Sequence, residues 1–224
     1  MSQIRFVIFD VDGTLVDSQE MIVRCLQAAC VDLGIPVPHS RQQLLSGVGL
    51  PLREAIPKAV PEIKPEQIGP FHDRFRHHYT ILHDNFDHSL QPLYPGARAM
   101  LAELRAEGMT LGICTSKMMV GLNTVLEQHE LRDLFVSIKT PDFGPGKPDP
   151  FLLNMAMREE NFTPQQTLFV GDSTYDMQAG VAAGVRCLAV AWGYHTPEQL
   201  LGAGAHKLIQ RMDQLVPSVK SWAV

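Results

Sequence analysis

FVIFDVDGTLVDS, residues 6–18, joins an apolar run to two closely spaced aspartates. Residues 6–9 are rich in β-forming side chains and too few for a helix, which predicts a buried strand. Asp10 and Asp12 lie two positions apart, so their side chains point the same way in an extended chain. Their repulsion becomes tolerable if a hard cation such as Mg²⁺ binds their oxygens, and Gly13 permits the tight turn that aims them. An Asx-type turn that only closes the strand is the alternative interpretation.

The composition of the 224-residue chain is that of an ordinary globular protein, with 45% hydrophobic and 19% charged residues. The net charge of −5 disfavours nucleic-acid binding, which needs clustered Lys and Arg. No apolar run reaches the roughly 20 residues of a membrane helix, and no signal-peptide core precedes Asp10. The four cysteines form no CxxC pair and are expected to be buried free thiols. We therefore expect a cytoplasmic protein without nucleic-acid or membrane partners, either a monomer or a homodimer.

Short apolar runs alternate with amphipathic helical stretches along most of the chain. This alternation predicts an α/β fold, a Rossmann-like parallel sheet covered by helices on both faces. The predicted strands are residues 4–9, 109–114, 136–139, 167–170 and 186–191. The predicted helices are residues 97–107, 118–129, 151–160 and 175–183, the last of them followed by Gly184 as a C-cap.

Residues 19–93 break this alternation, because they show helical patterns and no convincing strand. The pattern predicts an inserted all-helical domain after the first strand, with loops near residues 34–40 and 46–51. The expected division is an α/β core of residues 1–15 and 95–224 and a helical domain of residues 16–94. Linkers near residues 16–19 and 93–95 would join the two parts.

A second acidic pair follows another predicted strand. Asp172 comes directly after Gly171, and Asp176 opens the next helix. In parallel α/β sheets, ligands lie beyond the carboxyl ends of the strands, where such side chains meet. Asp172 is therefore a candidate metal ligand. Asp176 is a second candidate, unless its charge serves only to stabilise the N-terminus of the helix.

Two further strand ends carry residues suited to binding an anion. Thr115, Ser116 and Lys117 follow the strand at 109–114 and begin a helix, where hydroxyl and backbone N–H groups bind phosphate. Lys147 lies in PDFGPGKPDP, residues 141–150, whose prolines and glycines would hold its charge in one place. Each motif alone is compatible with an ordinary loop. Their order after successive strands favours one shared phosphate site.

With these four motifs the chain resembles the haloacid dehalogenase-like hydrolases, a superfamily dominated by Mg²⁺-dependent phosphatases. The motifs are residues 10–14 (DVDGT), residues 115–117 (TSK), Lys147 within GKPDP, and residues 171–176 (GDSTYD). DGTLVDS, TSK and GKPDP are most similar to the phosphoglycolate-phosphatase-like branch, although they also occur in pyrophosphatases, nucleotidases and sugar-phosphate phosphatases. The helical insertion resembles the small α-helical cap of this family, whose closure would exclude water from the site.

The resemblance implies hydrolysis of a small phosphate monoester, a phosphorylated metabolite, through an aspartyl-phosphate intermediate. Asp10 is expected to be the nucleophile, and Asp12 the acid that protonates the leaving oxygen and then the base that activates water. Lys147 is expected to orient Asp10. Expected ligands of Mg²⁺ are Asp10, Asp12 through its backbone carbonyl, Asp172 and, as a further candidate, Asp176. Expected phosphate-binding residues are Thr115, Ser116 and Lys147.

Four other kinds of protein compete with this interpretation. A receiver domain uses a similar residue set, but its phosphorylated aspartate lies mid-chain and it has no cap. A true dehalogenase lacks the second acid, so Asp12 argues against it. A phosphomutase of the β-phosphoglucomutase kind would use both aspartates and differ only in needing a bisphosphate activator. A non-catalytic binding protein is disfavoured because no core residue of the motifs is lost.

Substrate choice is expected to depend on the cap, because the four motifs contact only the phosphoryl group. In the cap loop at residues 46–51, Gly47 and Gly49 allow close backbone approach, and Arg53 follows within a turn. Arg53 is expected either to pair with a substrate carboxylate, as phosphoglycolate would require, or only to solvate the start of a helix.

Overall fold

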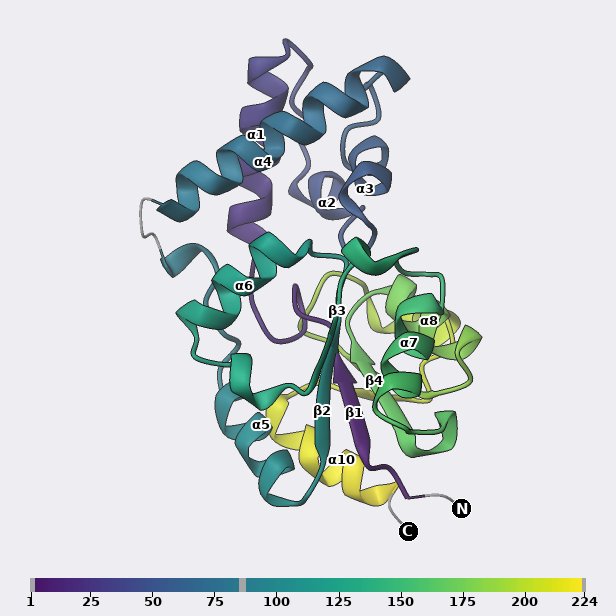
Figure 1. Cartoon of the computed structure of the whole chain (residues 1–224). Helices are drawn as coiled ribbons and strands as arrows, with labels where there is room; N and C mark the ends of the chain where they lie inside the picture. The colour runs from purple at the N-terminus through teal and green to yellow at the C-terminus, as the bar shows by residue number, and fades with distance from the viewer. Residues whose placement is uncertain (1–2, 85–87, 223–224) are drawn as a thin grey trace.

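A parallel six-stranded sheet forms the centre of the computed structural model, which describes residues 3–84 and 88–222 (Figure 1). The strand order is β3-β2-β1-β4-β5-β6, and each neighbouring pair is parallel. The strands are β1 (Phe6–Phe9), β2 (Thr110–Cys114), β3 (Ser137–Lys139), β4 (Thr167–Gly171), β5 (Arg186–Val190) and β6 (Lys207–Ile209). The predicted α/β class with a Rossmann-like sheet is confirmed.

The core helices agree with the prediction except near the C-terminus. They are α5 (Ala97–Ala106), α6 (Met119–Gln128), α7 (Phe151–Glu159), α8 (Thr174–Ala182), α9 (Pro197–Gly202) and α10 (Leu215–Ser221). The first four match predicted helices within a residue or two at each end. The predictions missed β6, α9 and α10, and the strand predicted to begin at residue 4 begins at Phe6. Helices α9 and α10 are too short to show a clear helical period.

Helices cover both faces of the sheet because alternate residues of each strand point to opposite faces. Val7 and Phe9 of β1 belong to a cluster with α5, α6 and α10. Phe6 and Ile8 belong to a second cluster with α7 and α8. All four side chains are fully buried, which explains why β1 is an uninterrupted apolar run.

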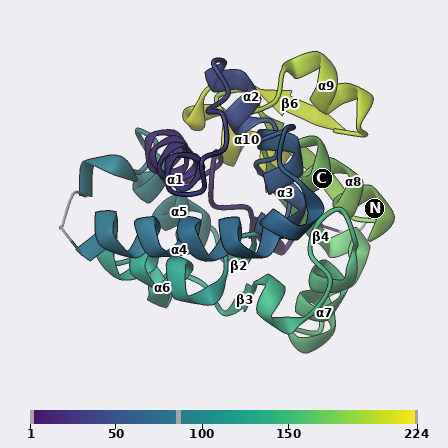
Figure 2. The same cartoon turned by 90° about the horizontal axis from the view of Figure 1, so that it is seen from above.

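Helices α1–α4 form the inserted all-helical cap, which lies over the carboxyl ends of the strands (Figures 1 and 2). Their bounds are α1 (Gln19–Asp32), α2 (Arg41–Leu45), α3 (Leu52–Ala59) and α4 (Ile68–Asp84), and residues 85–87 of the insertion lie outside the described residues. The cap has its own hydrophobic cluster, which draws on all four helices and includes Leu26, Leu44, Ile56 and Phe71. Because this cluster lies within the cap, the insertion packs as a separate layer.

The two linkers of the cap run side by side. Val16 and Leu93 form an antiparallel bridge. The backbone N–H of Tyr94 donates to the carbonyl of Leu15, and that of Asp17 donates to the carbonyl of Pro92, both at 2.9 Å. Because these two hydrogen-bonded linkers are where the chain passes between the two parts, we propose a cap of residues 16–94 and a core of residues 1–15 and 95–224.

All four cysteines are free and buried, as predicted. Burial raises the pKa of the thiols of Cys25, Cys114 and Cys187 to about 12, so they stay protonated and unreactive at neutral pH. Within residues 3–84 and 88–222, no helix combines the length and the apolar character that a membrane crossing needs.

Candidate active site

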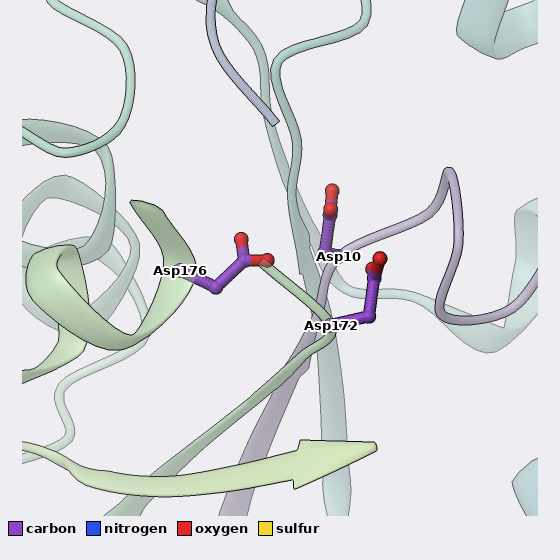
Figure 3. A group of neighbouring side chains, drawn as sticks. All are labelled: Asp10, Asp172 and Asp176. Atoms are coloured by element: carbon purple, nitrogen blue, oxygen red, sulfur yellow. The ribbon is translucent and has the colours of Figure 1, made fainter. Parts of the chain in front are cut away.

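Three buried carboxylates meet at the carboxyl ends of β1 and β4 (Figure 3). Asp10 directly follows β1, Asp172 follows β4, and Asp176 lies in the first turn of α8. Because β1 and β4 are neighbours in the sheet, these side chains converge, and one oxygen of each lies within 4.8 Å of the other two. The predicted meeting of Asp10 with Asp172 at one edge of the sheet is present in the structure.

When all three carboxylates are ionised, this group carries more negative charge than Lys147 neutralises. Burial raises the pKa of Asp10 from 3.8 to about 7, and Asp176 and Asp12 add to the rise while Lys147 opposes it. Burial and the neighbouring Asp176 and Asp10 also raise the pKa of Asp172 well above its usual value. Oδ1 of Asp10 is buried without a hydrogen-bond donor in suitable geometry among the described residues. Oxygen ligands of this kind fit a hard divalent cation such as Mg²⁺.

Asp172 is held in one orientation by two donors. The hydroxyl of Thr14 donates to its Oδ1 at 2.7 Å, and the backbone N–H of Tyr194 donates to its Oδ2 at 2.9 Å. Gly13 has φ +86°, and a Cβ there would lie 2.3 Å from Oδ2 of Asp172, so this turn requires glycine. The role of Tyr194 was not predicted from the sequence. Its loop follows the predicted strand 186–191 and therefore reaches the same edge of the sheet.

Lys147 connects two of the carboxylates. Its Nζ lies 2.9 Å from Oδ1 of Asp10 and 2.6 Å from Oδ1 of Asp176, and its side chain is 1% exposed. Burial alone would lower the pKa of Lys147. Asp10 and Asp176 raise this pKa by more than burial lowers it, so the amine stays charged. The predicted contact of Lys147 with Asp10 is present.

Asp176 is occupied on both oxygens. Oδ1 accepts from Lys147, while Oδ2 accepts from the backbone N–H of Ser173 at 2.9 Å and from its hydroxyl at 2.6 Å. The bond from the N–H of Ser173 and the reciprocal bond from the N–H of Asp176 to Oγ of Ser173, at 3.2 Å, form a capping box at the start of α8. Asp176 therefore stabilises the N-terminus of α8, which was one of its two predicted roles. Its other predicted role, as a metal ligand, stays a prediction.

Asp12 faces a lysine that the sequence analysis did not assign a role. Nζ of Lys117 lies 3.2 Å from Oδ1 of Asp12 and donates to the hydroxyl of Tyr79 at 3.2 Å and to Gln91 at 3.4 Å. Burial lowers the pKa of Lys117, but Asp12 and Tyr79 raise it by more. Because Tyr79 lies in α4, this amine connects the predicted acid and base to the cap. The sequence alone could not show that residues 38 positions apart make this contact.

Thr115 lies buried at the end of β2, as predicted for a phosphate-binding residue. Its backbone N–H donates to the carbonyl of Lys139 at 3.1 Å, and its Oγ1 accepts from the N–H of Lys117 at 3.2 Å. Among residues 3–84 and 88–222 the hydroxyl of Thr115 has no acceptor, so its hydrogen can be donated to a ligand. This favours the hydroxyl over the backbone N–H as the donor to a phosphoryl oxygen.

Ser116 joins the core to the cap. Its hydroxyl donates to the carbonyl of Gly49 at 2.6 Å, so the hydrogen predicted for phosphate is used inside the chain. Gly49 has φ +102°, and a Cβ there would lie 2.6 Å from Oγ of Ser173, which confirms the close backbone approach predicted for this cap loop. Pro51 likewise packs against Gly146, beside Lys147. The loop at residues 46–51 thus covers three of the four motifs.

Arg53 is not brought into the site. It is exposed on the cap and does not line the cavity between cap and core. Its guanidinium points instead toward Gly69 in α4, and its charge contributes to lowering the pKa of the exposed Asp73. The prediction that Arg53 faces the substrate is therefore not supported by its position, because the first turn of α3 turns it outward.

A family model described as haloacid dehalogenase-like hydrolase matches residues 7–190. The chain belongs to this family. The matched range includes all four motifs and the cap.

Among curated relatives of this haloacid dehalogenase-like hydrolase is a phosphoglycolate phosphatase from Aliivibrio fischeri, 33% identical over 204 residues that cover 88% of each chain. Among solved structures, CbbY from Rhodobacter sphaeroides in complex with phosphate has a TM-score of 0.78, 25% identity and coverage of 95% of this chain and 96% of that one. A haloacid dehalogenase-like family protein from Streptococcus pneumoniae has a TM-score of 0.85 at 22% identity, covering 96% and 98% of the two chains, which shows the shared fold.

Without a bound cation, the hydrolase is expected to lose stability as pH rises from about 4 to about 7. In this window the folded state keeps a proton on Asp10, whose pKa is about 7, while unfolding releases it because the unfolded pKa is near 3.8. The loss is at most about 1.4 kcal/mol per pH unit for one proton. Mg²⁺ should displace the proton and restore stability most strongly above pH 7. Urea unfolding with EDTA or Mg²⁺ at several pH values measures both effects.

Asp10→Asn is the control, because its amide does not titrate. The difference in unfolding free energy between the original chain and this variant isolates Asp10 from other pH-dependent groups. A difference that stays constant between pH 4 and 7 in EDTA would contradict the raised pKa.

Proposed function

We propose that this protein is a Mg²⁺-dependent phosphatase that hydrolyses a small phosphate monoester through an aspartyl-phosphate on Asp10. The observation that supports this best is the grouping of Asp10, Asp172 and Lys147 at one edge of the sheet, with Thr115 on the adjacent strand end. Asp10 supplies a nucleophile, Lys147 a fixed positive charge, and Thr115 a free hydroxyl hydrogen. The names of the curated relatives make phosphoglycolate the first ester to test.

The first half-reaction would transfer the phosphoryl group to the enzyme. A carboxylate oxygen of Asp10 attacks phosphorus as the bond between phosphorus and the alcohol oxygen breaks, and Asp12 gives its proton to that oxygen. Lys147 and the hydroxyl of Thr115 would stabilise the charge on the other phosphoryl oxygens. Bound to Asp10, Asp172 and the backbone carbonyl of Asp12, Mg²⁺ would neutralise charge on the carboxylates and on the phosphoryl oxygens.

The second half-reaction would return the enzyme to its starting state. Asp12, now without its proton, takes a proton from water as the water oxygen attacks phosphorus. The bond between phosphorus and Asp10 breaks, and inorganic phosphate leaves. Nζ of Lys117, 3.2 Å from Oδ1 of Asp12, would hold this carboxylate in place for the step. The contact of Lys117 with Tyr79 would make this arrangement depend on the position of the cap.

The test is phosphate release from a panel of monoesters, assayed with Mg²⁺ and with EDTA. We expect turnover with Mg²⁺ and a loss on the order of a hundredfold or more in EDTA, because the buried carboxylates then repel the phosphoryl group. A phosphomutase of the same fold would need a bisphosphate activator and would release little phosphate. Absence of phosphate release from every ester, with Mg²⁺ present, would refute the proposal.

We also propose that the substrate is a cytoplasmic metabolite and that the protein acts as a monomer or homodimer. The four free thiols support a reducing compartment. Size-exclusion chromatography with light scattering would decide the oligomeric state.

A further inference from the structure

A cavity of about 180 Å³ lies between the cap and the proposed phosphoryl site. On the core side it is lined by Asp10, Asp12 and Thr115, so it opens directly onto the reacting groups. For comparison, an apolar cavity of about 150 Å³ is large enough to bind benzene. The space therefore admits more than a phosphoryl group with two carbon atoms attached.

The cap side of this cavity is strongly apolar. Its wall includes Ile22, Leu26, Leu44, Val48, Leu52 and Phe75. These side chains come from α1, α2, α3, α4 and the loop at residues 46–51, so the apolar wall results from packing of the whole cap. Hydrocarbon placed against such a wall is stabilised by its removal from water.

The basic side chains that line this cavity are either paired with a carboxylate or exposed to solvent. Lys117 lines it, but its amine already pairs with Asp12. His72 and Arg76 also line it, but the ring of His72 lies 3.0 Å from the carboxylate of Asp73 and Arg76 is exposed to solvent, whereas Arg53 lies outside the cavity. A substrate carboxylate placed against the apolar cap wall would lose its hydration without gaining a counterion, at a high cost in free energy.

We infer that the preferred substrate is a phosphate monoester whose alcohol carries an apolar portion of several carbon atoms, which lies against the cap wall. This inference rests on the proposed phosphatase function and adds the chemical class of the leaving group. It differs from what the relatives' names suggest, since glycolate is a two-carbon acid without an apolar portion. The cap wall would then select the ester while the four motifs bind its phosphoryl group.

A series of ethyl, butyl and hexyl phosphate, compared with phosphoglycolate, tests this preference. The three alkyl esters have leaving alcohols of similar acidity, so differences in kcat/KM report binding of the hydrocarbon. We expect kcat/KM to rise about threefold to fourfold per added methylene group until the cavity is filled, as transfer of a methylene from water predicts. Butyl phosphate should exceed phosphoglycolate by about tenfold or more.

Val48→Thr tests the wall itself, because it exchanges a methyl group for a hydroxyl at nearly constant volume. The ratio of kcat/KM for hexyl phosphate to that for ethyl phosphate should fall about threefold or more. Val31→Thr is the matched control, since Val31 also lies in the cap but is 70% exposed and does not line the cavity. Its ratio should equal that of the original chain.

The outcomes separate this inference from the proposed function. Efficient hydrolysis of phosphoglycolate with a flat or falling alkyl series would overturn the inference and leave the phosphatase proposal intact. A rising alkyl series that Val31→Thr reduces as much as Val48→Thr would also overturn it. If none of the four esters releases phosphate with Mg²⁺ while other esters of the panel do, only this inference fails. If no ester of the panel does, the proposed function fails as well.

Discussion

Replacing Asp10 with asparagine is expected to lower kcat about a thousandfold or more. The amide is nearly isosteric with the carboxylate but cannot attack phosphorus, so the covalent step is lost. Neither of the two carboxylates grouped with Asp10 is placed to substitute. Asp172 is held by Thr14 and the N–H of Tyr194, and both oxygens of Asp176 accept hydrogen bonds from Lys147 and Ser173.

The measurement is steady-state turnover with Mg²⁺, together with mass spectrometry of enzyme quenched in acid during turnover. The original chain should show an adduct of one phosphoryl group on the peptide that contains Asp10, and the variant should show none. Asp213→Asn is the control, since Asp213 is an exposed carboxylate paired with Arg211. If Asp10→Asn retains a tenth of the original turnover, Asp10 is not the nucleophile.

The core of the fold could be predicted because its strands are buried on both faces. Such strands are uninterrupted apolar runs, so β1 and β4 are recognisable without any knowledge of their partners. β6 (Lys207–Ile209) is a three-residue edge strand that is only partly buried, so its sequence lacks that signal. It is defined by pairing with β5, which is a tertiary property.

The central site could be predicted for a related reason. Parallel strands end at the same edge, so polar residues directly after them converge whatever the rest of the chain does. This explains why Asp10 and Asp172 lie together as expected, whereas Lys147 reaches Asp10 from the longer loop that follows β3. Neither loop length nor the intervening cap changes that geometry.

The substrate side of the site could not be predicted from sequence. Which cap residues face the cavity depends on how α1–α4 pack and dock, and rotation of a helix by about half a turn exchanges one of its faces for the other. Arg53 illustrates this limit, because it lies close in sequence to the loop at residues 46–51 but faces solvent. Lys117 illustrates the converse, since its contact with Tyr79 exists only once the cap lies over the core.

Replacing Lys147 with methionine is expected to lower both stability and turnover. Methionine keeps most of the apolar stem but removes the only amine within reach of Asp10 and Asp176 among the described residues. Breaking a buried ion pair from one side typically costs about 3–5 kcal/mol of unfolding free energy, because the remaining charge has no partner. Loss of a charge aimed at the phosphoryl oxygens should lower kcat by about 10²–10³-fold. Urea unfolding in EDTA and steady-state kinetics with Mg²⁺ measure the two losses.

Two further variants show which property of Lys147 matters. Lys220→Met removes a lysine whose ion pair with Glu107 is about half exposed, so it should cost at most about 1 kcal/mol and leave kcat unchanged. Lys147→Arg keeps the positive charge, but its planar guanidinium cannot occupy the compact position between Asp10 and Asp176. It should therefore retain more stability than Lys147→Met while losing a comparable part of kcat.

Equal unfolding midpoints for Lys147→Met and the original chain in EDTA would show that the lysine does not stabilise the carboxylate group. A kcat within tenfold of the original would show that its charge does not act on the phosphoryl oxygens.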